Sequence, residues 1–449
     1  MEDCKREYYK KMPVKDLVVL AEQGDSEAQF RLGYRYKTSK GIKQNYKKAV
    51  EWLTKAAEQG HSNAQNTLGV CYKHGKGVKK DYSKAFEWYT KSAEQGNMSA
   101  QFNLGACYYM GYGVKQDYKK ALEWYFKAAE QGDSWSQNDI GMCYLNGYGV
   151  EKDLQKAIVW LTKSAKQGYA TAQYNLAQCY MYGDGVEQNM KKAVEFNKKA
   201  ALQDHMNAQY DLALCYEFGI GVESNMNTAL EWCIKAAKQG HAEAQYTLAI
   251  FYEMGHIVKE DHIKAVEWYT KSAKQGFADA QYNLAICYED GVGVKQDYAK
   301  AVFWYKKAAK QGLAVAQSNL ATCYQEGQGV KQNNVQGVKW YKKAAEQGDL
   351  SAIFGLGLCY HFGRGVKVNP KKAVEWYTKA ASKGHMMAQH NLSDCYQLGF
   401  GVNQDPLKAK MWFTRAAEQG DPEAQNSIRE LLLDQNNSLW EAYRQYQSI

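Results

Sequence analysis

Apolar residues return along the chain at intervals of three to four positions, in groups of two kinds that alternate. Ala28, Leu32 and Tyr36 represent the first kind, and Trp88 and Ala93 represent the second. Apolar positions at this spacing predict amphipathic α-helices that bury one face. The alternation therefore predicts units of two helices joined by a turn.

These units recur with a period of 36 residues. No insertion or deletion interrupts eleven full units between Asp25 and Gly420. Self-similarity at such a period is typical of solenoid architectures, in which each unit packs on its neighbours. We therefore expect an all-α solenoid of about eleven repeats. A glycine closes every unit except one, where Asp204 takes its place: Gly24, Gly60, Gly96, Gly132, Gly168, Gly240, Gly276, Gly312, Gly348, Gly384 and Gly420.

Recurring polar and glycine residues mark where each helix begins and ends. Paired turn glycines, as in Gly75-Lys76-Gly77-Val78, supply the positive φ needed at a helix end. A small residue such as Gly69 follows the leucine of each first helix and predicts close approach of a neighbouring helix. Each second helix opens with Asp or Asn, the preferred N-cap types. These caps are Asn45, Asp81, Asp117, Asp153, Asn189, Asn225, Asp261, Asp297, Asn333, Asn369 and Asp405.

The repeated pattern Ala-Glu-Gln-Gly, Ala-Gln, Asn-Leu-Gly, Cys-Tyr, Gly-x-Gly-Val, Asp, Lys-Ala, Trp-Tyr, Lys-Ala-Ala resembles the Sel1-like repeat, a relative of the tetratricopeptide repeat. The resemblance covers residues 25–420. It implies a right-handed superhelix whose first helices line the concave face, and a role as an adaptor or scaffold in protein complexes. Four residues depart from the pattern: Ser39, Phe196, Ile257 and Gly337.

The pattern divides the chain into three parts. Residues 1–24 are expected to hold an N-terminal extension with a capping helix, and residues 25–420 hold the eleven repeats. Residues 421–449 are expected to form a C-terminal capping helix, from Pro422 to Asp434, followed by a tail with a short helix at Ser438–Tyr446. Solenoids need end units of this kind, whose outer face is polar.

Charge and hydropathy limit the classes of function. The chain has 57 basic and 48 acidic residues and a net charge of +9, which is a mixed surface and not that of a dedicated nucleic-acid binder. It has no apolar run of 18 residues, so we expect no membrane insertion. The residue pattern favours a cytoplasmic monomer. A secreted effector, or a lumenal protein whose leader has been removed, stays open as an interpretation.

Cysteine usage agrees with a reducing compartment. Nine of the eleven cysteines occupy one repeat position, at which Phe251 stands once. That substitution shows a demand for an apolar side chain, so we expect buried free thiols.

Two further series belong to the second helices. We expect the recurrent tryptophans, such as Trp52 and Trp88, to lie in the core. The lysines three residues later, such as Lys55 and Lys91, are expected to form a solvated face near the helix C-terminus.

The variable positions of the first helices are the candidates for binding. In the central repeats they carry tyrosine, aliphatic residues and glutamate, which predicts a concave groove with an aromatic floor and an acidic margin. Such a groove fits a protein or peptide segment bearing Lys or Arg. In the alternative interpretation, the tyrosines only cover neighbouring helices and the carboxylates are solvated. The candidate residues are Tyr174, Tyr210, Leu214, Glu217, Tyr246, Ile250, Glu253, Tyr282, Ile286 and Glu289. The same surface near the N-terminus carries Arg31, Lys37 and Lys73, so the groove is expected to change sign.

Catalysis is not expected, and neither is a cofactor or a metal. The glycine loops follow helices, whereas a dinucleotide-binding loop follows a strand. His385, His390 and Cys395 come closest to a metal cluster but lack a fourth ligand. A hydrolase related to cysteine-rich relatives of this repeat is a weak alternative, because their paired cysteines and a Ser-x-x-Lys motif are absent.

Single-stranded RNA binding is the other alternative, since some helical repeats read one base per unit. The acidic centre of the expected groove argues against it, because phosphate would be repelled. The sequence thus predicts a non-catalytic scaffold for protein–protein interaction.

Overall fold

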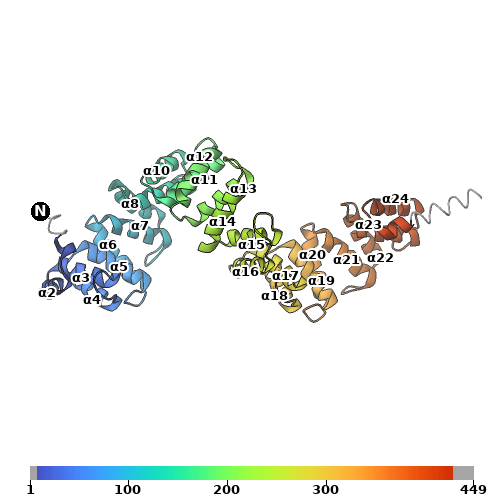
Figure 1. Cartoon of the computed structure of the whole chain (residues 1–449), viewed down its shortest axis with the longest axis horizontal. Helices are drawn as coiled ribbons and strands as arrows, with labels where there is room; N and C mark the ends of the chain where they lie inside the picture. Colours follow the sequence, from blue (N-terminus) through green and yellow to red (C-terminus); the bar gives the residue numbers. More distant parts are fainter. Residues whose placement is uncertain (1–7, 428–449) are drawn as a thin grey trace, which may run out of the picture. The chain divides into compact units, whose positions relative to one another are not determined.

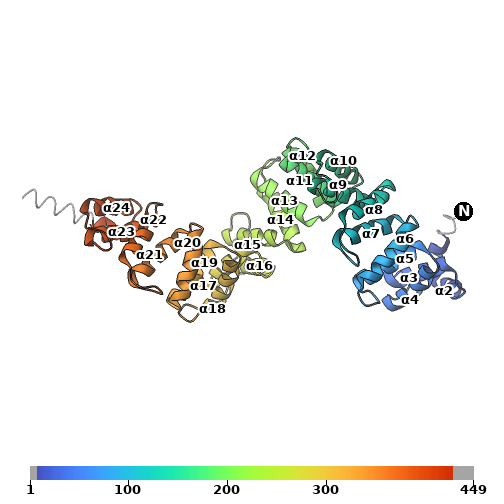
Figure 2. The same ribbon diagram turned by 180° about the vertical axis from the view of Figure 1, so that it is seen from behind.

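The structure is a computed structural model that describes residues 8–427 (Figure 1), and in this part of the chain it consists of helices packed pairwise. Two views show the first and second helix of a repeat side by side, for example α5 with α6 and α17 with α18 (Figures 1 and 2). The all-α fold of eleven repeats of about 36 residues is confirmed. The handedness of the superhelix stays a prediction.

Twenty-three helices, α2 to α24, lie wholly within the described residues. The first helices of the repeats are α3 (Ser26–Thr38), α5 (Ser62–His74), α7 (Met98–Met110), α9 (Ser134–Asn146), α11 (Ala170–Tyr182), α13 (Met206–Phe218), α15 (Ala242–Met254), α17 (Ala278–Asp290), α19 (Ala314–Glu326), α21 (Leu350–Phe362) and α23 (Met386–Leu398). The second helices are α4 (Tyr46–Glu58), α6 (Tyr82–Glu94), α8 (Tyr118–Glu130), α10 (Leu154–Lys166), α12 (Met190–Ala201), α14 (Met226–Gln239), α16 (His262–Lys274), α18 (Tyr298–Lys310), α20 (Asn334–Glu346), α22 (Pro370–Ala381) and α24 (Pro406–Glu418). The chain divides into two compact units, one ending at Trp232 and the other beginning at Cys233.

The predicted N-caps are confirmed. At Asp81 the carboxylate accepts a hydrogen bond of 3.0 Å from the backbone N–H of Lys84, and the caps of the other second helices repeat this contact. Each such bond satisfies one of the free N–H groups at a helix start.

Two non-glycine residues stand at turn positions where the other repeats carry glycine. Ser39 and Asp204 are the non-glycine residues of the described chain with positive φ, at 63° and 61°. They adopt the left-handed conformation that glycine supplies in the other repeats. Ile257 does not, so the turn of its repeat takes a different path.

In most repeats the second glycine of the turn lies against the preceding repeat. At Gly113, where φ is +73°, an added Cβ would lie 2.2 Å from the carbonyl oxygen of Tyr82, the first residue of α6. No side chain fits there. The turn therefore needs glycine both for its conformation and for this contact between repeats.

Small residues of the first helices allow close packing within a repeat. An added Cβ at Gly69 would lie 2.7 Å from the ring of Tyr89 on α6, which is fully buried. The close approach predicted from the sequence is thus confirmed. The nine recurrent cysteines, from Cys71 to Cys395, are buried and free, as predicted. Cys233 is also buried, and Cys4 lies outside the described residues.

A recurrent glutamine ties successive repeats together from inside. The side-chain amide of Gln29 is buried and donates to the carbonyl of Ala21 on α2 (Val14–Glu22) at 3.0 Å. Gln59, at the end of the same repeat, donates to the amide oxygen of Gln29 at 2.8 Å. Equivalent pairs recur from Gln95 onward along the chain.

The tryptophans and lysines of the second helices contact one another, whereas the sequence analysis assigned the tryptophans to the core and the lysines to a solvated face. Most of the tryptophans of this series, such as Trp88, are half-buried, while Trp232, Trp304 and Trp412 are buried. The lysine three residues later lies over the ring: Lys271 Nζ is 3.6 Å from the centroid of Trp268. A lysine or arginine covers the ring in this way in most repeats, so the predicted solvated face is partly a cation–π stripe.

The chain ends are partly described. At the N-terminus, α2 packs on α3 through Leu17, Ala21 and Leu32. That α2 serves as the cap of the solenoid stays a prediction. At the C-terminus, residues 422–427 are helical. The remainder of the predicted Pro422–Asp434 helix and the predicted Ser438–Tyr446 helix lie outside the described residues.

Candidate binding surface of the first helices

Six of the ten candidate residues belong to the second unit and lie on two adjacent first helices. Helix α15 carries Tyr246, Ile250 and Glu253, and α17 carries their equivalents Tyr282, Ile286 and Glu289. All six are half-buried. The tyrosines and isoleucines pack against the buried core of this unit and keep part of their surface exposed.

The rings of Tyr246 and Tyr282 each pack against other aromatic rings. The Tyr246 ring centroid lies 5.8 Å from that of Tyr269 and 5.1 Å from that of Phe277. The Tyr282 centroid lies 5.9 Å from that of Tyr305. Burial raises the pKa of both Tyr246 and Tyr282. The rings are thus held as neutral, partly exposed surfaces.

The two glutamates are held by buried tyrosine hydroxyls. Tyr269 Oη donates to Glu253 Oε2 at 2.6 Å and accepts from Asn283 Nδ2 at 3.1 Å. Tyr305 makes the same pair of contacts with Glu289 and Asn319. Burial first, and then the hydrogen bond to glutamate, raise the pKa of Tyr269 and Tyr305 well above the usual value. The hydroxyls stay protonated and fix the carboxylates in place.

This network was missed at the sequence level. The signal is a separation of 16 residues between glutamate and tyrosine in both repeats, with the asparagine 14 residues further on. Asn283 and Asn319 come from the next repeat along the chain, so each network joins two repeats. The carboxylates of Glu253 and Glu289 are therefore half-buried and hydrogen-bonded.

The other four candidates belong to the first unit. Tyr174, Tyr210, Leu214 and Glu217 are half-buried. The Tyr174 ring stacks on His205 with centroids 4.6 Å apart, and burial raises the pKa of Glu217. That all ten residues line a single wall stays a prediction.

The first unit also exposes an aromatic group that sequence reasoning did not select. Trp135 on α9 is 51% exposed and lies between Phe102, at 5.3 Å, and Tyr169, at 6.3 Å. One turn later, the Asp139 carboxyl is hydrogen-bonded to the side chains of Asn138 and the buried Tyr125. Burial raises the pKa of Asp139 to about 6. The signal was present, since the equivalent positions Glu27, Asn63, Ser99 and Thr171 are all small or polar.

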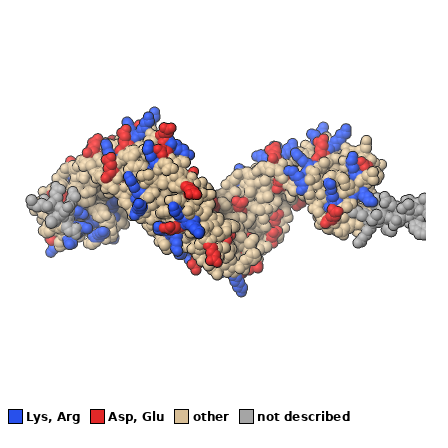
Figure 3. Space-filling model, turned by 90° about the horizontal axis from the view of Figure 1, so that it is seen from above, with Lys and Arg blue, Asp and Glu red and all other residues tan. Residues whose placement is uncertain are grey.

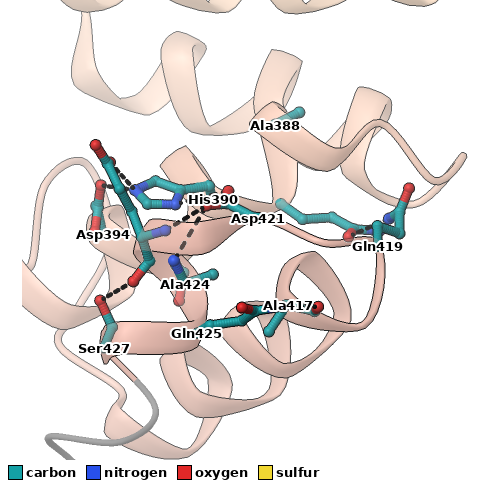
Figure 4. Close-up of polar contacts among 12 residues, drawn as sticks. Ala388, His390, Asp394, Ala417, Gln419, Asp421, Ala424, Gln425 and Ser427 are labelled. Atoms are coloured by element: carbon teal, nitrogen blue, oxygen red, sulfur yellow. Dashed lines mark hydrogen bonds and ion pairs between the residues drawn. The ribbon is translucent and has the colours of Figure 1, made fainter.

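The three residues considered for zinc have separate structural roles. The His385 Nδ1 atom accepts the N-cap hydrogen bond from Ala388 N at 3.2 Å, and Cys395 is buried. His390 contacts Asp421 Oδ2 at 3.0 Å (Figure 4), while the other oxygen of Asp421 caps the helix that follows. Within residues 8–427 no group of His, Cys, Asp or Glu is arranged to hold a metal ion.

No helix in the described part of the chain is long and apolar enough to cross a membrane. Lysine, arginine and carboxylate side chains are interspersed over the face shown in Figure 3.

Comparison with protein families assigns the repeats. The profile of the Sel1 repeat matches eleven segments in succession: 26–61, 62–97, 99–133, 136–169, 170–205, 207–241, 242–277, 278–313, 314–349, 350–385 and 387–421. The chain belongs to the Sel1 repeat family. Each matched segment contains one first helix and one second helix, so the Sel1 repeats coincide with the structural repeats.

Two solved structures of Sel1-like proteins are similar over most of their length. One is c5321, a protective antigen of uropathogenic Escherichia coli with an SLR fold; it is 36% identical with a TM-score of 0.74, over 95% of this chain and 91% of that one. The other is a Sel1 repeat protein of Oxalobacter formigenes, 35% identical with a TM-score of 0.54, over 71% of this chain and 93% of that one. No curated protein gives a match. The chain is therefore a Sel1 repeat scaffold.

Proposed function

We propose that this Sel1 repeat protein is a non-catalytic adaptor whose first helices bind a protein or peptide segment carrying Lys or Arg. The observation that carries the proposal is the pair of Tyr–Ile–Glu sets on α15 and α17, whose carboxylates are held by Tyr269 and Tyr305. A fixed carboxylate beside a partly exposed aromatic ring suits a guanidinium or ammonium group, which gains both a charged hydrogen bond and a cation–π contact.

The arrangement also reduces the cost of binding. The acceptors are already oriented by hydrogen bonds and the rings are already packed, so fewer side-chain rotamers are lost when a partner docks. Aromatic residues in such surfaces tend to dominate affinity. The expected partner residues are therefore basic side chains that approach α15 and α17 together.

A displayed random-peptide library selected on the wild-type chain tests this function. We expect the selected peptides to be enriched in Lys and Arg. The double variant Glu253→Gln/Glu289→Gln keeps an oxygen acceptor for both tyrosines while removing two charges, and it should weaken these peptides at least about tenfold. Tyr246→Ala/Tyr282→Ala should also weaken binding at least about tenfold.

The control is Ile263→Ala/Glu267→Gln on α16. It also truncates an exposed apolar side chain and removes one glutamate charge, four residues apart on a second helix. It should leave affinity within about twofold, as expected for contacts outside the interface. Peptides without basic residues, or equal affinity for the wild type and both groove variants, would refute the proposal.

A further inference from the structure

A concentration of positive charge lies at the turns of the first two repeats. Five lysines occur between residues 73 and 84, and the one carboxylate of this stretch, Asp81, caps α6. Lys37 holds the position of Lys73 in the preceding repeat. We call Lys37, Lys73, Lys76 and Lys80 the lysine patch.

The members of the patch act on one another electrostatically. Burial first, and then the charges of all four lysines of the patch, lower the pKa of His74. Burial lowers the pKa of Lys37, and the charge of Lys76 adds to the effect. Within residues 8–427 none of the four lysines forms an ion pair with a carboxylate. The positive charge is therefore uncompensated by the described chain.

Two of these lysines lie over aromatic rings, one at the start of α4 in the preceding repeat and one at the start of α6 in the same repeat. The Lys76 ammonium lies 5.6 Å from the centroid of Tyr46, and the Lys80 ammonium lies 4.6 Å from that of Tyr82. Both lysines are exposed. A cation that rests on a ring loses less rotamer freedom on binding than a free lysine side chain.

We propose that the lysine patch binds an acidic peptide segment, one with several Asp or Glu residues close together in sequence. Charge complementarity favours an anionic occupant. A peptide is favoured over single-stranded nucleic acid because bases bind by stacking on open aromatic faces. Here Tyr82 stacks on Tyr112 at 4.5 Å and is also contacted by Lys80. The inference concerns the first two repeats and a partner of the opposite charge, so it can fail while the proposed function at α15 and α17 holds, and the reverse.

The test uses fluorescence anisotropy of a labelled hexaglutamate peptide on the full chain. We expect binding at low salt that weakens as the salt concentration rises. Lys73→Glu/Lys76→Glu/Lys80→Glu should lower the affinity at least about tenfold, since it reverses three charges at one place. The charge-neutral variant Lys73→Gln/Lys76→Gln/Lys80→Gln should lower it by a smaller factor, and circular dichroism checks that both variants stay helical.

The matched control is Lys295→Glu/Lys331→Glu/Lys367→Glu. These three exposed lysines follow the Gly-x-Gly-Val turn as Lys79 does, but each lies in a different repeat. The control changes the net charge by the same amount without touching the patch. An equal loss in the control, no binding of hexaglutamate at low salt, or tighter binding of a twelve-nucleotide oligouridylate with the same lysine dependence would each overturn the proposal.

Discussion

Histidine replaces Asp or Asn as the N-cap of four first helices. In α13 the Nδ1 atom of His205 accepts from Ala208 N at 3.2 Å, and His61, His241 and His385 make the same bond. A protonated imidazole cannot accept this bond, because Nδ1 then carries a proton. Burial lowers the pKa of His205 and His385, which agrees with a folded state that favours the neutral ring.

The caps formed by His205 and His385 predict a loss of stability in mild acid. Because the folded pKa is depressed, their contribution is complete above the unfolded value of about 6.5 and falls as the pH drops toward the folded value. His205→Asn/His385→Asn should reduce this pH dependence, with each cap contributing about 1 kcal/mol at neutral pH. Asn97 already fills this position in α7. Urea unfolding at pH 7.5 and 5.5 measures the difference, and an unchanged difference in the variant would contradict the argument.

Two buried tyrosines at the same repeat position differ in their hydrogen bonding. The Tyr269 hydroxyl joins Glu253 and Asn283, whereas the buried Tyr89 hydroxyl has no partner within the described residues. Tyr269→Phe should therefore cost about 1–3 kcal/mol, since it leaves a carboxylate and an amide unpaired. Tyr89→Phe should be neutral or stabilising. Equal losses in the free energy of unfolding would mean that the hydroxyl network contributes nothing.

At the scale of the element, two turn glycines differ in why glycine is needed: one only for its left-handed backbone, the other also for lack of space. Gly96 and Gly113 both have positive φ, but a Cβ at Gly96 meets nothing within 4 Å, whereas one at Gly113 meets the Tyr82 carbonyl. Gly96→Ala should cost about 1–2 kcal/mol for the left-handed backbone alone. Gly113→Ala should cost more, because the turn must also move off the preceding repeat. Thermal unfolding of the two variants compares them, and similar midpoints would show that the turn adjusts freely.

Sequence reasoning predicted the elements better than the contacts between them. The caps at Asp81 and its equivalents follow from residue type alone, because an N-cap is a local interaction. The ring orientation that brings Lys271 over Trp268 depends on how neighbouring helices enclose the tryptophan, which a spacing of three residues does not specify. The Tyr269 network likewise depends on packing between repeats. The residues of the candidate site were therefore named without the groups that hold the carboxylates.

At the scale of the molecule, the recurrent cysteine gives nearly every repeat its own buried thiol. Burial raises the pKa of Cys107 to about 11 and of Cys143 to about 12, so few thiolates form at neutral pH. Alkylation in the folded state should therefore require opening of the repeat that holds the thiol. All eleven thiols should react in denaturant without reductant.

Pulsed alkylation read by mass spectrometry should then show a gradient. Solenoid stability is a sum of nearest-neighbour interfaces, and end repeats have fewer of them. Cys71, in the second repeat, and Cys395, in the eleventh, should be labelled before Cys143 and Cys323, which have at least two further repeats on each side. Simultaneous labelling of all thiols would indicate one cooperative unit in place of repeat-wise opening.

The glutamine contacts and the glycine turns have a consequence for the gene. Gln29 meets the carbonyl of Ala21, and Gly113 meets Tyr82, through contacts that recur in most other repeats with the same spacing. An unequal crossover that removes or adds 36 codons would thus place two repeats next to each other that can form the same contacts as before. We expect natural relatives of this chain to differ in length by whole multiples of 36 residues. A change of any other length would disrupt the contacts between two successive repeats.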